Sequence, residues 1–97
     1  MPSGFVIANV EITDPKLYDT YSAKAIASVE KYKGEFMVRG GRYQRLDGNE
    51  PLPTIFIVKF PTYEQALAWF RSPEYESIKD TRSRAASSNM IVVEGID

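Results

Sequence analysis

The sequence contains neither cysteine nor histidine among its 97 residues. Without cysteine it can form no disulfide and offers no thiolate nucleophile, and without histidine it cannot build a Ser-His-Asp or Cys-His triad. The same absences exclude zinc sites with thiolate or imidazole ligands and haem held by these side chains. Any catalysis must therefore use carboxylates, tyrosine, lysine, arginine, a bound cofactor or positioning alone. We expect no cofactor and no such metal site.

Long hydrophobic runs and a strong charge of one sign are also lacking. No apolar stretch approaches the ~20 residues of a membrane span, and the segment Met1-Pro2-Ser3-Gly4 lacks the basic and apolar regions of a signal peptide. The formal net charge is −1, with lysine and arginine scattered among aspartate and glutamate. The sequence therefore predicts a cytoplasmic protein that binds neither nucleic acid nor membranes.

The length and composition predict one globular domain over residues 1–97. Hydrophobic residues make up 43% of the chain and charged residues 26%, which is ordinary for a folded domain. A chain this short buries only about 60 to 65% of its extended surface when it folds alone. Contact with a partner subunit would therefore stabilise it.

The first half of the chain predicts a strand, a long helix and a second strand. The first strand covers residues 4–12. Asp14-Pro15 then supplies an N-cap followed by proline at the first helical position. Apolar residues at three- and four-residue spacing continue this helix to Lys33, and Gly34 is predicted to stop it. The second strand is expected from Glu35 to Leu46.

The second half predicts a hairpin, a helical region and a last strand. A turn over residues 47–53 leads into a third strand, Thr54 to Phe60, so strands two and three should pair. Thr62-Tyr63-Glu64-Gln65 fits a capping box that opens a short helix. Ser72-Pro73 repeats the cap-then-proline pattern, and a second helical segment should run from there to Ala86. Residues 89–95 form the last strand.

The resulting order, βαββαβ, predicts a ferredoxin-like α+β fold. Right-handed connections give an antiparallel four-stranded sheet in the order 4-1-3-2, with both helices on one face. Strands one, three and four carry apolar residues in both alternating phases, a pattern typical of strands buried on both sides. Two helices cover only one face. We therefore expect a homodimer in which two sheets pack face to face.

Residues 36–45, with the sequence FMVRGGRYQR, combine three arginines with a double glycine inside a predicted strand. Glycines in a strand indicate a bulge or a close backbone approach, here beside guanidinium groups suited to holding an anion. Arg39 has apolar strand neighbours, which predicts partial burial. A buried guanidinium needs an ion pair, here with Glu11, Glu35 or Glu94, or a ligand anion. Both interpretations stay open.

Further candidate residues are aromatic side chains on the helices and one polar side chain on the first strand. Tyr18 and Tyr75 each lie in the first turn of a predicted helix, Trp69 lies on the second helical region, and Asn9 is polar in an apolar strand. The aromatic side chains either pack in the core or line a pocket for a flat organic ligand, in which Asn9 would be one of the orienting polar groups.

Three basic residues, Lys79, Arg82 and Arg84, lie toward the end of the last predicted helix. A favourable interaction with the negative end of the helix dipole accounts for them, and we prefer this interpretation to phosphate binding.

Several pieces of the chain, in this order, resemble the family labelled domain of unknown function 1330. They are Asp14-Pro15 with Tyr18 and Tyr21, then Tyr32-Lys33-Gly34, residues 36–41 (FMVRGG), Phe60-Pro61, and residues 68–70 (AWF) leading into 72–75 (SPEY). The resemblance covers nearly the whole chain. It implies a dimeric α+β barrel, related to small monooxygenases and lactone isomerases that hold ligands between sheet and helices. Asn9 stands where some relatives have histidine.

The sequence thus predicts a protein that binds a small organic anion between sheet and helices, with Arg39 as anchor. It is either a cofactor-free oxygenase or isomerase, in which Tyr or Glu moves a proton while Arg39 stabilises an enolate or carboxylate, or a non-enzymatic binding or stress-related dimeric module with structural arginines. A carboxylate with a raised pKa beside Arg39 in an enclosed pocket would favour the enzyme. A filled barrel with Arg39 fully paired would favour the module.

Overall fold

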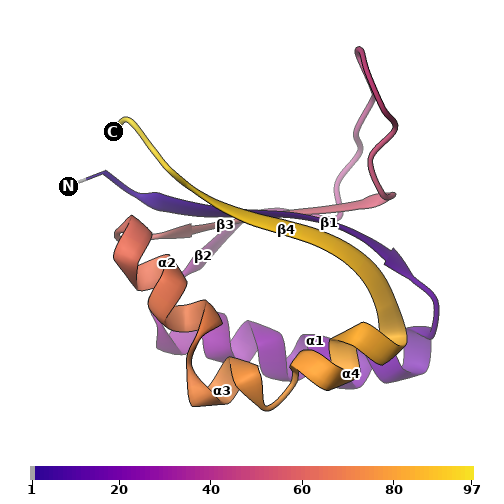
Figure 1. The fold of residues 1–97 in the computed structure, drawn as a ribbon, viewed down its shortest axis with the longest axis horizontal. Helices are drawn as coiled ribbons and strands as arrows, with labels where there is room; N and C mark the ends of the chain where they lie inside the picture. The colour runs from indigo at the N-terminus through magenta and orange to yellow at the C-terminus, as the bar shows by residue number, and fades with distance from the viewer. Residues whose placement is uncertain (1) are drawn as a thin grey trace.

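The computed structural model describes residues 2–97 and has the predicted βαββαβ order, with the second helical region divided into three. The elements are β1 (Gly4–Ile12), α1 (Pro15–Lys31), β2 (Glu35–Arg39), β3 (Thr54–Phe60), α2 (Tyr63–Phe70), α3 (Pro73–Glu76), α4 (Lys79–Ala85) and β4 (Ala86–Glu94). The strands form one antiparallel sheet in the order β2-β3-β1-β4, and the helices lie on one face of it (Figure 1). This confirms the predicted ferredoxin-like fold.

Two sequence-based expectations about membranes and targeting concern the chain as a whole. Within residues 2–97, no helix is both long enough and apolar enough to cross a membrane. Met1, which belongs to the N-terminal segment considered above for a signal peptide, lies outside the described residues.

The core lies between the sheet and the helices. Along β1, alternate side chains point to the helices and are buried, namely Val6, Ala8 and Val10. Against them packs an aromatic cluster in which the ring centroids of Trp69 and Tyr75 are 4.4 Å apart. Tyr75 is completely buried. The strand alternation therefore decides which side chains of β1 meet the helices and which lie on the opposite face.

The start of α1 is as predicted and its end is not. The Asp14 carboxylate accepts a hydrogen bond from the Leu17 backbone N–H at 3.1 Å, which confirms the N-cap. The helix ends at Lys31, and Lys33 rather than Gly34 takes the left-handed conformation, with φ 66°. Gly34 is required for space, because a Cβ there would lie 2.7 Å from the Val29 side chain.

The caps of α2 and α3 are confirmed, but the capping box is only half formed. The Thr62 hydroxyl accepts from the Gln65 backbone N–H at 3.0 Å, and the Ser72 hydroxyl accepts from the Tyr75 N–H at 3.2 Å. The Gln65 side chain donates instead to the Tyr32 carbonyl, at 3.0 Å, and so ties α2 to the end of α1.

The predicted continuous helix from residue 73 to Ala86 is wrong. The chain breaks between α3 and α4, and Ile78, at the break, is buried in the core. The last strand begins at Ala86, which pairs with Ile12, and not at Asn89. Pairing with β1 therefore extends the strand over three residues that local sequence pattern assigned to the helix and the following turn.

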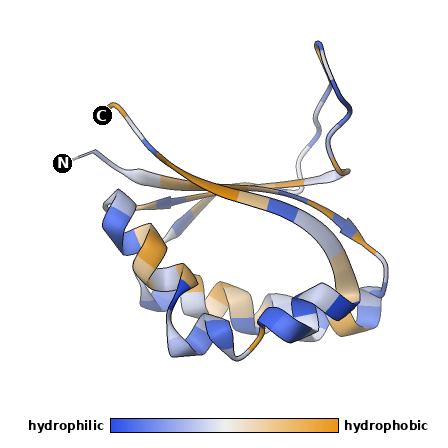
Figure 2. Cartoon of the chain, in the orientation of Figure 1, coloured by the Kyte–Doolittle hydropathy of each residue, from blue (hydrophilic) through white to orange (hydrophobic). Residues whose placement is uncertain are grey.

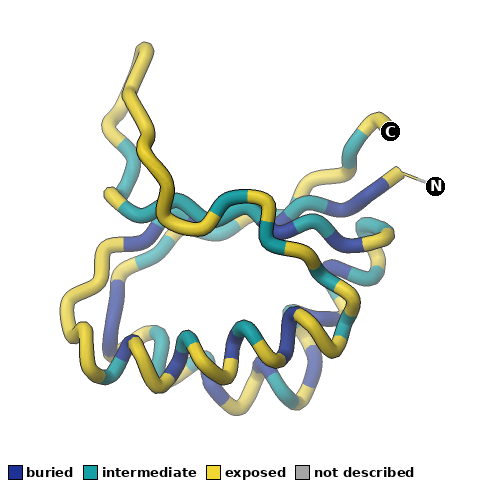
Figure 3. Tube along the Cα trace, turned by 180° about the vertical axis from the view of Figure 1, so that it is seen from behind, coloured by how far each residue is buried: buried dark blue, intermediate teal, exposed yellow. Residues whose placement is uncertain are grey.

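The predicted second strand to Leu46 is also wrong. β2 ends at Arg39, and residues 40–53 form a loop that projects from the sheet on the side away from the helices and is almost entirely exposed (Figures 1 and 3). Gly40 adopts a left-handed φ of 73°, and its N–H closes the pairing with a bond of 2.7 Å to the Ile55 carbonyl. The chain then leaves the sheet, although β2 and β3 do pair as predicted.

The face of the sheet away from the helices carries an apolar row, as predicted from both phases of the strands. Val38, Ile57, Ile7 and Ile91 are consecutive cross-strand neighbours from β2 through β3 and β1 to β4. We call these four residues the outer row. Ile91 remains 61% exposed, and Figure 2 shows the hydrophobic stretch along β4. This face presents a hydrophobic strip across the full width of the sheet.

A charged cluster joins α1 to α3, and it predicts a pH effect. Lys31 forms an ion pair with Glu74, and the Tyr32 hydroxyl donates to the same carboxylate at 3.0 Å. The hydrogen bond from Lys31 is the main cause that lowers the pKa of Glu74 to about 2. The pair therefore stabilises the fold fully above the usual carboxyl pKa and loses this effect as the pH falls toward 2.

We expect Glu74→Gln to lower the melting temperature near neutral pH, with the difference from wild type shrinking below about pH 4.5. Thermal melts of both proteins between pH 2 and pH 7 measure this. Glu30→Gln serves as control, since Glu30 is exposed and forms no ion pair within residues 2–97. A difference between wild type and Glu74→Gln that stays constant over this range would contradict the assignment.

Candidate functional site

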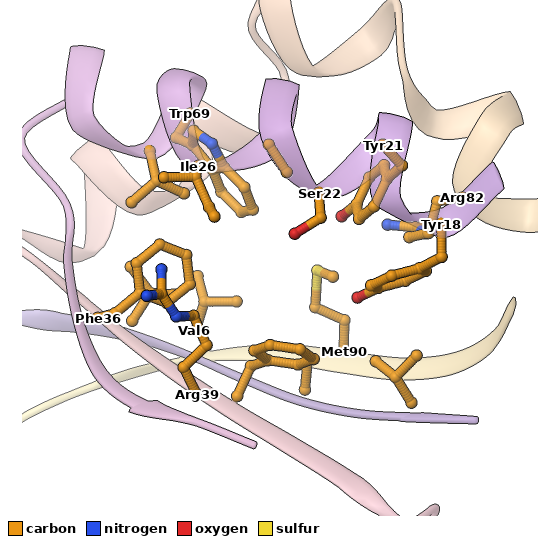
Figure 4. Close-up of a pocket in the computed structure, with 16 residues that line it drawn as sticks. Val6, Tyr18, Tyr21, Ser22, Ile26, Phe36, Arg39, Trp69, Arg82 and Met90 are labelled. Carbon is orange, nitrogen blue, oxygen red and sulfur yellow. The ribbon is translucent and has the colours of Figure 1, made fainter. Parts of the chain in front are cut away.

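A cavity of about 60 Å³ lies between the sheet and α1 (Figure 4). Its walls are mostly aliphatic and aromatic side chains. They come from β1 (Val6, Ala8, Val10), α1 (Tyr18, Tyr21, Ser22, Ala25, Ile26, Val29), β2 and β3 (Phe36, Arg39, Phe56, Val58), and from Trp69, Arg82 and Met90. The only charged residues in this lining are two arginines, so the cavity combines apolar walls with uncompensated positive charge.

A bulge in β2 places Arg39 at this cavity. Phe36 is opposite Val58 and Arg39 is opposite Phe56, with Met37 as the extra residue between two paired positions. Residues three apart on a regular strand point to opposite faces, but the bulge returns Arg39 to the same face as Phe36. The guanidinium carbon lies 5.1 Å from the centroid of the Phe36 ring. The bulge therefore orients Arg39 toward the helices.

The environment of Arg39 differs from the one predicted. The side chain is exposed, because β2 is an edge strand that ends there, so the predicted partial burial is wrong. It forms no ion pair with Glu11, Glu35 or Glu94, all of which the structure describes. The structural ion pair considered above is therefore absent from this chain.

The sequence predicts a bulge or a close backbone approach at the double glycine, but the bulge lies at Met37 and both glycines follow the end of β2. Gly40 is needed for its left-handed backbone, and a Cβ there would meet the Thr54 side chain at an ordinary 3.6 Å. Of these two glycines, Gly41 alone borders open space, with no atom within 4 Å of the position that a Cβ would take. Gly40 thus ends the strand at Arg39.

Arg82 brings a second guanidinium to the cavity from α4. Its Nη1 donates to the Tyr75 hydroxyl at 2.7 Å, and this hydroxyl lies 2.7 Å from that of Tyr21. The Arg82 Nε is buried and has no hydrogen-bond partner within residues 2–97. Figure 4 shows Arg82 beside Tyr18 and Tyr21, at the opposite end of the cavity from Arg39.

From the sequence, Arg82 is explained by the helix dipole and is not predicted to line the cavity. Ile78, Arg82 and Ala85 follow one another at four- and three-residue spacing, so Arg82 lies on the buried stripe of the helix. That spacing is the sequence feature that could have predicted a buried position for Arg82. Lys79 and Arg84, by contrast, form ion pairs on the surface with Glu76 and Asp80.

The tyrosines at the cavity stay neutral. Burial raises the pKa of Tyr21 far above its usual range and, to a smaller degree, also raises the pKa of Tyr18. These phenols are therefore hydrogen-bond donors at neutral pH and not bases.

The structure brings together three of the five predicted site residues. Arg39, Tyr18 and Trp69 line the cavity. Tyr75 lies behind the wall and is hydrogen-bonded to two residues that line it, Tyr21 and Arg82. Asn9 lies on the other face of the sheet, where its side-chain oxygen accepts from the Leu52 backbone N–H at 3.1 Å. Asn9 therefore does not belong to this site.

Comparison with known proteins gives a family and a fold. The model of the family described as Domain of unknown function (DUF1330) matches residues 3–96. Among solved structures, a protein of unknown function from Rhodopseudomonas palustris is 18% identical, with a TM-score of 0.77 over 99% of this chain and 84% of that one. SnoaB, a cofactor-independent oxygenase from Streptomyces nogalater, is 8% identical, with a TM-score of 0.67 over 100% of this chain and 96% of that one.

A putative antibiotic biosynthesis monooxygenase from Nitrosomonas europaea is 14% identical, with a TM-score of 0.54 over 97% of this chain and 90% of that one. No curated protein matches the sequence. At these identities the solved structures show the fold alone, which is that of the dimeric α+β barrel proteins.

Proposed function

The chain belongs to the family of domain of unknown function 1330, and from this premise we propose that it binds a small organic anion in the cavity between the sheet and α1. The observation that carries the proposal is the charge of the lining. Two guanidinium groups, Arg39 and Arg82, border an apolar cavity whose lining contains no carboxylate. An anion would supply the missing negative charge.

The walls and the volume limit the ligand. Aliphatic and aromatic side chains suit a ring or hydrocarbon body, and Arg39 at the exposed end can offer two parallel donors to a carboxylate or enolate. A volume of about 60 Å³ corresponds to about four to six water-sized spheres. We therefore propose a single-ring or similarly small ligand.

The same lining restricts the chemistry of an enzyme. Neither a glutamate nor a lysine lines the cavity, and burial keeps Tyr21 protonated. The sequence-based hypothesis that a glutamate moves a proton therefore lacks its glutamate in this cavity. A substrate would have to arrive ionised, as an enolate, phenolate or carboxylate, with Arg39 stabilising its charge. An enzyme of this kind would be a cofactor-free oxygenase, the activity named for SnoaB, or an isomerase, in either case acting on acidic substrates.

We also infer that two copies of the chain pair through the outer faces of their sheets. The support is the outer row, Val38, Ile57, Ile7 and Ile91, which crosses all four strands without cover from the helices. Exposed apolar strips of this extent mark interaction surfaces, and a twofold pairing covers the same strip on both copies.

Binding of benzoate, with benzamide as the uncharged ligand of similar shape, tests the anion site. We expect benzoate and not benzamide to raise the melting temperature of the wild type. Arg39→Lys should keep the fold within about 0.5 kcal/mol, because the side chain is exposed. It should weaken benzoate binding about tenfold, since lysine cannot form two parallel bonds.

Titration calorimetry of benzoate with both proteins measures the difference. Arg45→Lys is the matched control, because Arg45 lies in the exposed loop and does not line the cavity. The anion site is excluded if benzoate binds no better than benzamide. If wild type and Arg39→Lys bound benzoate equally well, Arg39 would not be the anchor of the ligand.

A further inference from the structure

We infer that Arg82, Tyr75 and Tyr21 form a directed hydrogen-bond chain that presents the Tyr21 hydroxyl proton to an oxyanion of the bound ligand. The inference rests on the proposed function and adds a second contact at the end of the cavity opposite Arg39. It also narrows the ligand class. The ligand would be a small ring with a phenolate or enolate oxygen at one end and a second electron-rich polar group at the other.

The direction of the chain follows from Arg82. A guanidinium has only donors, so Arg82 Nη1 must donate to the Tyr75 oxygen, 2.7 Å away. The Tyr75 proton is then available for its other neighbour, the Tyr21 oxygen, also at 2.7 Å. In this arrangement Tyr21 accepts from Tyr75 and keeps its own proton for another acceptor.

The reverse arrangement is unfavourable because of burial. If Tyr21 donated to Tyr75, the Tyr75 oxygen would accept twice and its own proton would have no acceptor. Tyr75 is completely buried, and a buried donor without an acceptor is unfavourable. Tyr21 lines the cavity, and its proton can reach a ligand atom. The arrangement that satisfies the buried group therefore directs the Tyr21 proton into the cavity.

Several features strengthen this donor. A chain of hydrogen bonds that begins at a cation polarises each successive O–H group. Arg82 forms no ion pair in the described part of the chain, so no carboxylate neutralises the positive charge behind the phenols. The Tyr75 ring packs against both Trp69 and Phe70, at centroid distances of 4.4 and 5.4 Å. Donors fixed in advance in this way stabilise oxyanions.

The geometry of the two ends specifies a suitable probe. Figure 4 shows Arg39 and the group of Tyr21, Tyr18 and Arg82 at separate ends, with apolar side chains between them. In 4-nitrophenol the phenol oxygen can face Tyr21 while the nitro group faces Arg39. Its absorbance distinguishes phenol from phenolate, so the probe reports its own protonation state in the cavity.

The experiment is an absorbance titration of 4-nitrophenol against pH, with wild type and variants in excess. We expect the bound probe to ionise about one pH unit below the free probe, which is a tenfold preference for the phenolate. Tyr21→Phe should remove most of this shift, and Arg82→Met should reduce it. Circular dichroism checks the fold of each variant. Tyr63→Phe is the control, because Tyr63 does not line the cavity.

The outcomes separate this inference from the proposed function. The proposed hydrogen-bond chain is contradicted if bound 4-nitrophenol ionises at the same pH as the free probe. It is also contradicted if Tyr21→Phe keeps the shift in ionisation, or if Tyr18→Phe alone removes it. It is also overturned if benzoate binds and 4-nitrophenol does not. In each of these cases the binding of benzoate still decides independently whether Arg39 anchors an anion. If neither benzoate nor 4-nitrophenol binds, the proposed function itself fails.

Discussion

Replacing Ile7 with aspartate is expected to separate the proposed homodimer into monomers and to lower the melting temperature. Ile7 lies in the outer row, directly between Ile57 and Ile91 on the neighbouring strands. In a twofold interface the substitution would bury one uncompensated carboxylate from each copy. Because dimer formation stabilises the folded chain by mass action, dissociation and loss of stability should appear together.

Sedimentation velocity at micromolar concentration, with melting curves at several protein concentrations, measures both effects. Val10→Asp is the informative contrast, since Val10 points to the helices and is 3% exposed. It should unfold the chain instead of releasing folded monomers. Ala27→Asp, which adds the same charge on the exposed side of α1, should change neither. A monomeric wild type would disprove the dimer.

Replacing Trp69 with alanine is expected to destabilise the chain by about 3 to 5 kcal/mol, as for other large aromatic truncations in cores. The indole is 3% exposed. It packs against Tyr75 and Phe60, whose ring centroids lie 4.4 and 5.4 Å away. Its N–H also donates to the Ser28 hydroxyl at 2.9 Å. The substitution removes this bond, and the new space adjoins the cavity that Trp69 lines.

Urea unfolding of wild type and Trp69→Ala gives the difference in unfolding free energy. Phe70→Ala is the matched control, because Phe70 is the next residue, also aromatic, and only half-buried. Phe70→Ala should lower the unfolding free energy clearly less than Trp69→Ala does. If the two variants were equally stable, the packing of Trp69 in the aromatic cluster would not be a main source of stability.

Local sequence pattern was sufficient for the features that depend on a few adjacent residues. The caps at Asp14, Thr62 and Ser72 were predictable because a side-chain oxygen at the right position binds an N–H three residues later. The bounds of β3, Thr54–Phe60, were also predictable, since a proline precedes the strand and another follows it.

The features that sequence pattern missed depend on contacts between distant segments. β2 ends at Arg39 because Gly40 turns the backbone after its bond to Ile55. The position of Arg82 at the cavity depends on the break at Ile78, which changes the direction of the chain before α4. Arg39 was selected as a site residue for its neighbours in sequence, whereas its orientation comes from pairing with β3.

The bulge at Met37 means that the anchor of the proposed site cannot be recognised by its distance from Phe36 alone. If β2 kept all its residues but paired regularly, position 39 would move one step along β3, from Phe56 to Ile55, and its side chain would turn to the outer face. In a chain without the extra residue, the position opposite Phe56 would lie two residues after the phenylalanine instead of three. An arginine at that position would face the cavity in the same way. Within this family, an arginine should therefore be matched by its partner on β3, since two chains of different strand length can present the same guanidinium to the cavity.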